Sequence, residues 1–349
     1  MSTKKPLNVG VIGVNLGKGH CEAYNQNPDA KLLAICDSDK EWLDYCKEKY
    51  NVPIIYTDYK ELLANPDIDA VSICLPTSLH KEATIAAFER GKHVLCEKPM
   101  ALNVAVAEAM NDAAIKAGKK LMISQNQRFA EDAVYLKRLV ENGTFGDIYF
   151  IRTGWRRPMG MMPGPLGKRE NGAAINRNWF NEKNNGGGVL RDLGSHLIDL
   201  AMFLTGFPEH ESASCSCYRK FFPDNYEEYK DKYTIDSEDL AAGHLKFKNG
   251  MSMQLEVSFG SQVESEVIFT EIYGTKAGAS RRNGRIKIFR CEDNVATVEE
   301  IRGMKIPIKK SMDWFIESII NDTEVPVTGA QGIEIIKILD AVYASGGLS

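Results

Sequence analysis

A carboxylate, an ammonium group and a proline stand side by side at Glu97-Lys98-Pro99. They follow a short apolar run, His93 to Cys96, that is typical of a buried strand. A lysine at the end of such a strand can hydrogen-bond a hydroxyl and favour its alkoxide as hydride leaves, while Glu97 orients the lysine or binds a cofactor. Pro99 fixes the backbone, and a cis Lys-Pro bond is one way to do so. A solvated surface Glu-Lys pair is the alternative interpretation.

Three polar residues recur at helical spacing in the segment GGGVLRDLGSHLIDLAMFLTG, residues 186–206. Asp192, His196 and Asp199 occupy positions i, i+4 and i+7, which lie on one face of a helix. On an otherwise apolar helix such groups carry a desolvation cost unless they pair or face a cleft. Histidine is the natural acid or base near neutral pH, and a neighbouring carboxylate sets its tautomer. A satisfied His–Asp pair in the core is the alternative, and the spacing indicates no metal site.

The elements that must position Lys98 alternate between apolar strand-like runs and helical patterns, which predicts a parallel sheet covered on both faces. The predicted strands cover residues 7–12, 31–36, 53–56, 69–75, 92–96 and 120–124. The predicted helices cover residues 39–50, 58–64, 79–91 and 103–118. We therefore predict a doubly wound α/β Rossmann domain over residues 1–125, with Lys98 at the carboxyl edge of the sheet, where ligands bind.

The pattern changes after Ser124 to strands with alternating polar and apolar residues. The predicted strands cover residues 147–155, 211–220, 238–248, 251–259, 266–273 and 285–291, and the predicted helices 129–142, 193–205, 311–321 and 330–344. Asn249-Gly250, between two strands, is a strong hairpin signal. We predict an α+β substrate-binding and oligomerisation domain over residues 126–349 with a large, mostly antiparallel open sheet. Its last helix is a candidate to pack back on the first domain.

Two features of the second domain bear on function. An antiparallel sheet of this size has a face that needs covering, so we expect a homodimer or homotetramer through it. Residues 156–188 read as a long loop rich in Gly, Pro and Asn, and a loop of this length is usually functional or disordered.

A phosphate-binding turn is predicted where Gly13 directly follows the first strand. A strict G-x-G-x-x-G pattern would place a second glycine at Asn15, whereas the glycines present are Gly13, Gly17 and Gly19. The turn needs a tight bend, backbone close to a pyrophosphate and a helix N-terminus aimed at it. Asparagine tolerates positive φ better than most residues, so we expect Asn15, with Leu16 beside it, to serve in the turn.

Asp37 closes the second predicted strand, where a carboxylate accepts hydrogen bonds from the adenosine ribose hydroxyls, with Ser38 next to it. A carboxylate there also repels a 2′-phosphate, so the sequence favours NAD over NADP. An N-cap for the helix that starts near Asp39 is the alternative interpretation of Asp37. Pro76-Thr77, at the end of the fourth strand, would border the cofactor from the carboxyl edge of the sheet.

These motifs together resemble the Gfo/Idh/MocA oxidoreductase family, which includes glucose–fructose oxidoreductase and myo-inositol dehydrogenase. The resemblance covers nearly the whole chain, through PTSLHKEATIAAFERGKHVLCEKP, NQRF, GGGVLRDLGSHLIDLAMFLTG and GTKAGA. It implies Lys98, Asp192 and His196 as the catalytic group, with His196 as general base and Lys98 on the reacting hydroxyl. Asp192 would orient His196 or contact the substrate. The glycine turn departs from the family pattern at Asn15, which bears on pyrophosphate geometry rather than on the chemistry.

The resemblance also implies the surroundings of the cofactor: Gly13, Asp37, Pro76, Thr77, His80 and Glu97. Asn126 and Arg128 match the family motif that borders nicotinamide and substrate. We expect further substrate contacts from Arg156, Trp179 and Asp199. Trp179-Phe180 is equally well interpreted as a hydrophobic anchor for its loop.

Composition and charge narrow the class of protein. A chain of 349 residues suggests two domains, and 44% hydrophobic with 26% charged residues is typical of a globular protein. No stretch resembles a signal peptide or a membrane span, so we expect a cytoplasmic protein. The net charge of −4, without long runs of one sign, gives no electrostatic case for nucleic acid or membranes. The 8 cysteines contain no C-x-x-C pair and are expected to be reduced.

The sequence therefore predicts an NAD-dependent dehydrogenase that oxidises a secondary alcohol of a sugar or inositol, or reduces the matching ketone. Two alternatives remain open from the sequence. In one, tightly bound NAD is recycled in each turnover and the net reaction is glycoside hydrolysis or epimerisation. In the other, the protein is a non-catalytic NAD-binding regulator, against which Lys98, Asp192 and His196 argue, because a sensor needs no acid/base set.

Overall fold

The computed structural model describes residues 5–159, 161, 166–221 and 231–347, so residues 160 and 162–165 of the predicted long loop lie outside it. The chain divides into two compact units. The first comprises Met1–Asn126 with Lys309–Ile336, and the second comprises Gln127–Ile308 with Lys337–Ser349. The sequence placed all of residues 126–349 in one domain, whereas the structure groups residues 309–336 with the first unit.

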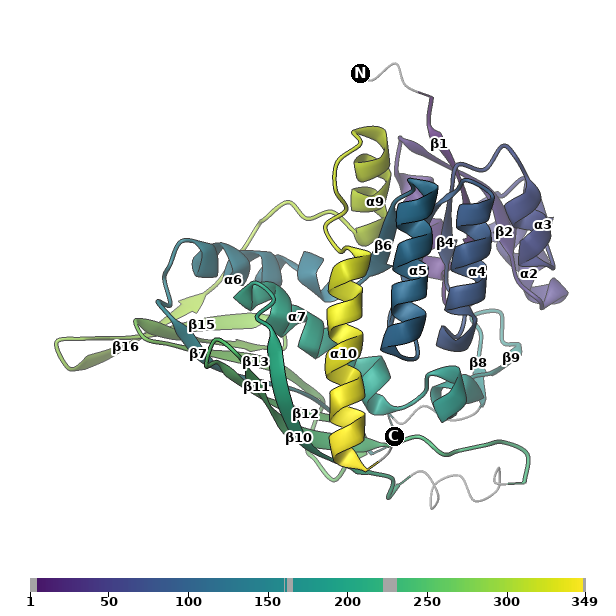
Figure 1. Ribbon diagram of the computed structural model, residues 1–349. Helices are drawn as coiled ribbons and strands as arrows, with labels where there is room; N and C mark the ends of the chain where they lie inside the picture. Colours follow the sequence, from purple (N-terminus) through teal and green to yellow (C-terminus); the bar gives the residue numbers. More distant parts are fainter. Residues whose placement is uncertain (1–4, 160, 162–165, 222–230, 348–349) are drawn as a thin grey trace. The chain divides into compact units, whose positions relative to one another are not determined.

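The first unit is a parallel sheet with helices on both faces (Figure 1). Within the described residues the sheet has six strands in the order β3-β2-β1-β4-β5-β6. The strands are β1 (Leu7–Ile12), β2 (Ala30–Cys36), β3 (Ile54–Tyr56), β4 (Ala70–Ile73), β5 (His93–Glu97) and β6 (Leu121–Ser124). The helices are α1 (Lys18–Gln26), α2 (Lys40–Tyr50), α3 (Tyr59–Ala64), α4 (Thr77–Glu89), α5 (Val104–Ala117) and α9 (Ser311–Ile320). The predicted doubly wound fold is confirmed.

Local signals set the ends of these helices. The Asn103 side chain accepts a hydrogen bond from the Val106 amide at 3.0 Å, and Gly118 ends α5 in the left-handed conformation at φ +60°. The strand order reverses between β1 and β4, which creates the switch point where doubly wound sheets bind ligands. Ligand-binding side chains of this unit are therefore expected after the carboxyl ends of β1, β2, β4 and β5.

The second unit contains a larger sheet, which in the described part of the chain has eight strands in the order β10-β11-β12-β7-β13-β14-β15-β16. Its strands are β7 (Ile148–Pro158), β10 (His210–Tyr218), β11 (Leu240–Phe247), β12 (Ser252–Ser261), β13 (Val267–Gly274), β14 (Ala277–Arg282), β15 (Arg285–Glu292) and β16 (Val295–Ile301). Only the β12–β7 pair is parallel among these. Asn249-Gly250 makes the predicted hairpin turn, with Gly250 at φ +86°. A two-stranded ribbon, β8 (Leu166–Lys168) and β9 (Ala174–Asn176), lies in the predicted loop.

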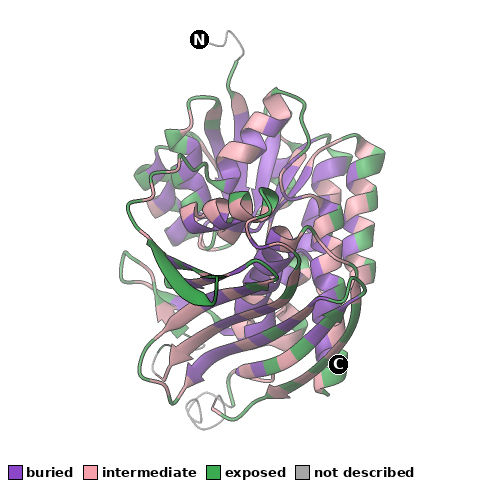
Figure 2. Cartoon of the chain, turned by 90° about the vertical axis from the view of Figure 1, so that its left-hand side faces the viewer, coloured by how far each residue is buried: buried purple, intermediate pink, exposed green. Residues whose placement is uncertain are grey.

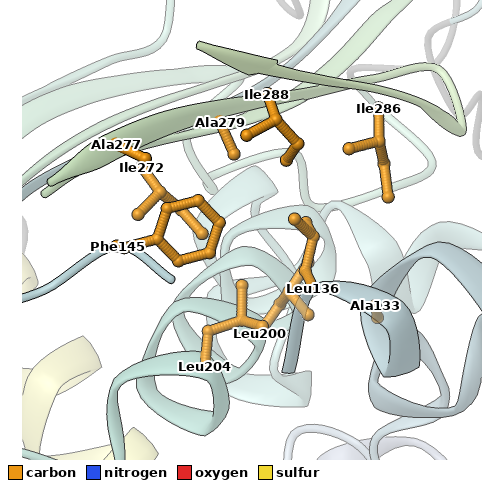
Figure 3. Close-up of a cluster of buried hydrophobic side chains, with 10 residues drawn as sticks. All are labelled: Ala133, Leu136, Phe145, Leu200, Leu204, Ile272, Ala277, Ala279, Ile286 and Ile288. Carbon is orange, nitrogen blue, oxygen red and sulfur yellow. The ribbon is translucent and has the colours of Figure 1, made fainter. Parts of the chain in front are cut away.

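Helices α6 (Glu131–Glu141) and α7 (Ser195–Thr205) bury one face of this sheet. Leu136, Leu200 and Leu204 from the helices meet Ile272 and Ile288 from the strands (Figure 3). At the edge of the sheet, β16 is exposed along nearly its whole length (Figure 2). The last helix, α10 (Gly329–Gly346), begins in the first unit and ends in the second. Within the described residues, no helix is long and apolar enough to cross a membrane.

Candidate active site

The structure explains the irregular spacing of the three glycines after β1, because it shows which of them have no room for a side chain. Gly13 follows β1 at φ +86°, and a Cβ there would lie 2.3 Å from the carbonyl oxygen of Cys74. Gly17 has no room either, because its Cβ would lie 2.6 Å from a methyl group of Val11. Gly19, by contrast, has open space around it. Two of the three glycines are therefore required by the backbone, and the second leads directly into α1, whose first amide groups favour a phosphate.

Asn15 does not play the part that the sequence suggested. It is not among the residues with positive φ, so its tolerance of that conformation is not used here. It is half-buried beside the exposed Leu16, and the Gly17 amide closes the turn onto the Gly13 carbonyl at 2.9 Å. The turn therefore closes on itself without a second glycine at this position.

Asp37 lies at the carboxyl end of β2, next to the glycine turn, because the Gly13 amide donates to the Cys36 carbonyl at 2.8 Å. It is not the N-cap of α2, so that alternative is wrong. The cap is Asp39, whose carboxylate accepts a backbone amide of the first turn. Asp37 is half-buried and accepts the Asp39 amide at 3.2 Å, and Ser38 beside it is exposed. A carboxylate at this place suits the ribose hydroxyls of a dinucleotide.

Pro76 is the N-cap of α4 and Thr77 its first residue, and both follow the carboxyl end of β4. His80, which the resemblance placed at the cofactor, is instead turned into the protein and is 1% exposed. Its Nε2 lies 2.8 Å from the Leu75 carbonyl oxygen, and its Nδ1 lies 3.1 Å from that of Pro99. Burial lowers the pKa of His80, and these carbonyl contacts oppose that change. His80 therefore fastens the loop after β5 to the start of α4.

Lys98 follows β5 at this same edge, and its peptide bond to Pro99 is cis. Glu97 is engaged on both carboxylate oxygens, since Oε1 lies 3.0 Å from Nε2 of His20 and Oε2 accepts the Lys98 amide at 3.1 Å. Burial alone would raise the pKa of Glu97, but the hydrogen bond and charge of His20 and the charge of Lys98 hold it at about 2. Glu97 is thus ionised and orients the backbone of Lys98. His20 was not predicted from the sequence. Its position just after the glycine turn was the one feature that could have indicated a role.

In the second unit a π-helical segment, Leu190–Gly194, carries Asp192 and leads without a break into α7, which carries His196. The sequence predicted an α-helix over residues 193–205, and Asp192 precedes that helix in a wider turn. The Asp192 amide donates to the Gly188 carbonyl at 3.0 Å, and the Asp192 side chain is half-buried. His196 is 8% exposed. Single π-turns inside helices are frequent at functional sites.

Glu238 holds this π-helical segment in place. Its Oε1 accepts the Leu190 amide and the Tyr343 hydroxyl, both at 2.9 Å, and the side chain is buried. Gly188 makes this approach possible, because a Cβ there would lie 2.4 Å from the carboxylate oxygens. Burial raises the pKa of Glu238, and the Leu190 amide is among the groups that oppose the rise. Gly188, in the glycine run before Asp192, is therefore needed because it leaves room for the buried carboxylate of Glu238.

Arg128 and Asp199, both predicted to bind substrate, bind each other. The guanidinium donates from Nε to Oδ2 at 2.7 Å and from Nη2 to Oδ1 at 2.6 Å, and each side chain is 1% exposed. Burial raises the pKa of Asp199, and the charge of Arg128 opposes the rise. We therefore withdraw the pair from the substrate contacts, because neither side chain has surface to offer a ligand.

Arg156 was also predicted to contact substrate, but it lies on the other face of the sheet from His196. Trp155, its neighbour in β7, has its ring centre 6.2 Å from that of His196. Successive side chains of a strand point to opposite faces, so Arg156 faces away and pairs with Glu256 at 3.5 Å. The Trp155 indole donates to Glu266 at 2.8 Å, which fixes its ring. Alternation along β7 was the signal that could have selected Trp155 in place of Arg156.

Two further predicted contacts are placed as follows. Trp179 stacks on Phe180 with ring centres 3.6 Å apart, which supports the interpretation as a loop anchor. Asn126 is exposed at the end of the first chain segment of the first unit, where it begins a 3₁₀ turn, Asn126–Phe129. Among the described residues no group of three or more His, Cys, Asp or Glu side chains could hold a metal ion.

Comparison with known proteins bears on both units. Residues 7–125 match the model described as "Oxidoreductase family, NAD-binding Rossmann fold", and residues 133–280 match that of the "GFO/IDH/MocA C-terminal domain". The chain belongs to the Gfo/Idh/MocA family. It is an NAD-binding oxidoreductase, as the resemblance implied.

Proteins similar to this chain include dehydrogenases named for a glucoside and for myo-inositol. D-glucoside 3-dehydrogenase of Escherichia coli (strain K12) is 31% identical over 98% of this chain and 96% of its own. Myo-inositol 2-dehydrogenase of Thermotoga maritima is 35% identical over 57% of this chain and 55% of its own. Among solved structures, levoglucosan dehydrogenase in complex with NADH matches with a TM-score of 0.85 at 23% identity, over 98% of this chain and 97% of that one. This last likeness shows the fold.

Proposed function

We propose that this member of the Gfo/Idh/MocA family is an NAD-dependent dehydrogenase of a secondary alcohol in a sugar, sugar derivative or inositol. The observation that carries the proposal is an ionised, fully engaged Glu97 that fixes Lys98 at the carboxyl edge of a cofactor-binding sheet. Relatives named for glucosides and for inositol support the substrate class. To His196 and Asp192, on consecutive turns of the second unit, the proposal assigns the acid/base roles.

Each of these side chains has a role in alcohol oxidation. The C–H bond of the carbinol breaks with its electron pair, the O–H proton leaves, and a carbonyl forms. His196 takes the hydroxyl proton, Lys98 donates a hydrogen bond to the same oxygen as negative charge develops there, and Asp192 orients His196. When bound, the nicotinamide ring supplies the acceptor for the hydride.

The first unit has a place that fits this cofactor. At Gly13 and Gly17 the backbone leaves no room for a Cβ, and the amide groups that open α1 suit a pyrophosphate. Asp37 suits the ribose hydroxyls and disfavours a 2′-phosphate, so NAD is preferred to NADP. We propose that the cofactor is held by residues at this edge: Gly13, Asn15, Leu16, Asp37, Ser38, Pro76, Thr77 and Asn126.

Trp155 replaces Arg156 among the proposed substrate contacts. Its ring is fixed by Glu266 and lies beside His196 on the face of the sheet that α7 covers. An indole there offers an apolar surface to the C–H face of a sugar or cyclitol ring.

The experiment that tests this function follows NADH formation, with NAD or NADP, on a panel of inositols, aldoses, glucosides and anhydrosugars. We expect growth of NADH absorbance with at least one polyol and NAD. A flat trace with every compound, from a protein that carries a dinucleotide through purification, would reject net dehydrogenation in favour of a recycled cofactor.

Substitution of the lysine tests the assignment of residues. Lys98→Met should lower kcat by about 10²–10³-fold, because the hydrogen bond to the developing alkoxide is lost. Affinity for NAD in a direct titration should change little. Lys116→Met, at an exposed position of α5, is the matched control and should turn over like the wild type. Near-normal turnover of Lys98→Met would show that the catalytic assignment is wrong.

We further propose that two copies of the chain associate through the outer face of the large sheet. A row of directly paired residues crosses five neighbouring strands of this face. It consists of Phe150, Tyr273, Gly278, Phe289 and Val298. The rings of Phe150 and Tyr273 are 5.2 Å apart, and Phe289 and Val298 are 40% and 60% exposed. An exposed apolar row of this kind is typical of a protein–protein interface.

The charges beside the apolar row suit a second copy of the same face. Arg152 lies 3.6 Å from Glu256 and 3.7 Å from Glu271, so both signs occur together and the patch can be self-complementary about a twofold axis. Phe289→Asp should reduce the mass measured by light scattering to that of a monomer. Ile115→Asp is the control, because Ile115 is 71% exposed on α5, a helix of the first unit, and is not part of the large sheet. A wild type that is monomeric at all concentrations, or a Phe289→Asp variant of unchanged mass, would reject this interface.

A further inference from the structure

The side chain of His20 connects the glycine turn to the strand that ends at Glu97. His20 lies in the first turn of α1, shortly after Gly17, and is 5% exposed. Its Nδ1 lies 2.9 Å from Oγ of Ser72 on β4, and its Nε2 lies 3.0 Å from Oε1 of Glu97 on β5. Because β4 stands between β1 and β5 in the sheet, one imidazole ring spans the switch point from the turn after β1 to the end of β5.

Glu97 carries this connection on to Lys98. Its second oxygen accepts the Lys98 amide at 3.1 Å, and Ser124 of β6 hydrogen-bonds the same carboxylate. The Glu97 side chain is 22% exposed, so protein groups rather than water compensate most of its charge. Without His20 the carboxylate would lose the imidazole hydrogen bond at Oε1 and would turn toward water. The Lys98 backbone would then lose the acceptor that fixes it.

We propose that His20 is a positioning residue that holds Lys98, through Glu97, in a fixed relation to the turn where the cofactor pyrophosphate binds. The inference rests on the proposed function, since it takes Lys98 as catalytic and the glycine turn as the cofactor site. His20 needs no contact with substrate or cofactor for this role. Its two ring contacts make the position of α1 and the position of Lys98 depend on each other.

Two variants that differ only in reach test the inference. His20→Gln places an amide on a side chain long enough to meet Glu97, whereas His20→Asn is one methylene shorter and stops near Ser72. His20→Asn should lower kcat by about tenfold to a hundredfold, the loss expected for one hydrogen bond to a charged group, and should weaken NAD binding in a titration without polyol. His20→Gln should recover most of both.

Tyr24→Phe is the matched control within the same network. The Tyr24 hydroxyl lies 2.7 Å from Oγ of Ser72 and therefore shares that partner with His20, while the contact with Glu97 belongs to the imidazole. Its kcat and NAD affinity should stay within about twofold of the wild type, on the scale of a single neutral hydrogen bond away from the site. Melting temperatures of all three variants, measured without NAD, report any loss of folding separately.

Three outcomes decide the matter. The expected order, with His20→Asn impaired and His20→Gln and Tyr24→Phe near the wild type, supports the inference. Wild-type behaviour of His20→Asn, or equal losses in all three variants, overturns it, because the contact with Glu97 would then have no specific effect. The NAD titration needs no turnover. If the wild type oxidises no polyol, the proposed function is rejected, and the NAD titration of the His20 variants still tests the positioning role of His20.

Discussion

Arg128 and Asp199 face each other as a bidentate ion pair in the interior of the second unit, with N–O distances of 2.7 and 2.6 Å. The guanidinium also lies 4.9 Å from the ring centre of Phe207. The pair joins the 3₁₀ turn Asn126–Phe129 to α7, the helix that carries His196. Each side chain of the pair is 1% exposed, so the pair fixes the turn against α7, and neither charge is accessible to a ligand.

Because the pair is buried, removal of one charge should destabilise the protein much more than removal of both. Arg128→Met should lower the free energy of unfolding by about 3–5 kcal/mol, because it leaves the Asp199 carboxylate buried without its partner. The double variant Arg128→Met/Asp199→Leu should recover most of that loss, since both charges are gone. Urea unfolding of the wild type, the two single variants and the double variant measures the coupling. A loss below about 1 kcal/mol in the single variant would contradict a buried pair.

The glycine turn gives a prediction that separates required from dispensable glycines. Gly13→Ala should weaken NAD binding strongly, because the residue has φ +86° and its Cβ would lie 2.3 Å from the Cys74 carbonyl oxygen. Gly19→Ala should leave NAD binding unchanged and stabilise the protein by up to about 1 kcal/mol, since it lies in α1 with open space around it. Calorimetric titration with NAD and thermal unfolding measure the two effects. Equal losses in both variants would contradict the backbone argument.

The carboxylate of Asp37 predicts the choice of cofactor. Asp37→Ala should raise the KM for NAD by about tenfold to a hundredfold through lost hydrogen bonds to the ribose. The KM for NADP should fall, because the repulsion of the 2′-phosphate is removed. Ser38→Ala, at the exposed neighbouring position, is the control and should change the NAD-to-NADP ratio much less. An unchanged ratio in Asp37→Ala would show that the carboxylate does not select the cofactor.

The strands of the first unit and the helix α5 were predictable because their signals are local, whereas α1 (Lys18–Gln26) was not predicted as a helix. Strands buried on both faces read as continuous apolar runs, and residues such as Asn103 and Gly118 mark helix ends without tertiary information. In the second unit, β14 (Ala277–Arg282) was missed because AGASRR has small and charged residues in place of β-branched ones. Its pairing with β13 and β15 decides its conformation.

The candidate site was predictable in its residue types and less so in its geometry. The spacing of Asp192 and His196 fits an α-helix and a π-turn equally well, and the choice is made by Glu238, a carboxylate far away in the sequence. The pairing of Arg128 with Asp199 is likewise a long-range contact that no local pattern contains. These are effects of tertiary structure, and a pattern along one segment carries no information about them.

The ionised state of Glu97 predicts how stability depends on pH. Its pKa falls from an ordinary 4.5 to about 2 in the folded protein, so the folded state binds fewer protons than the unfolded chain between these values. The stabilisation is therefore present above pH ~4.5, where it amounts to at most about 3 kcal/mol, and is lost as the pH falls toward 2. Glu97→Gln should be less stable than the wild type at neutral pH, and the difference should narrow progressively on acidification. Urea unfolding at a series of pH values measures it, with Glu108→Gln, exposed on α5, as the control. A difference between Glu97→Gln and the wild type that is constant with pH would show that Glu97 does not carry this charge in the folded protein.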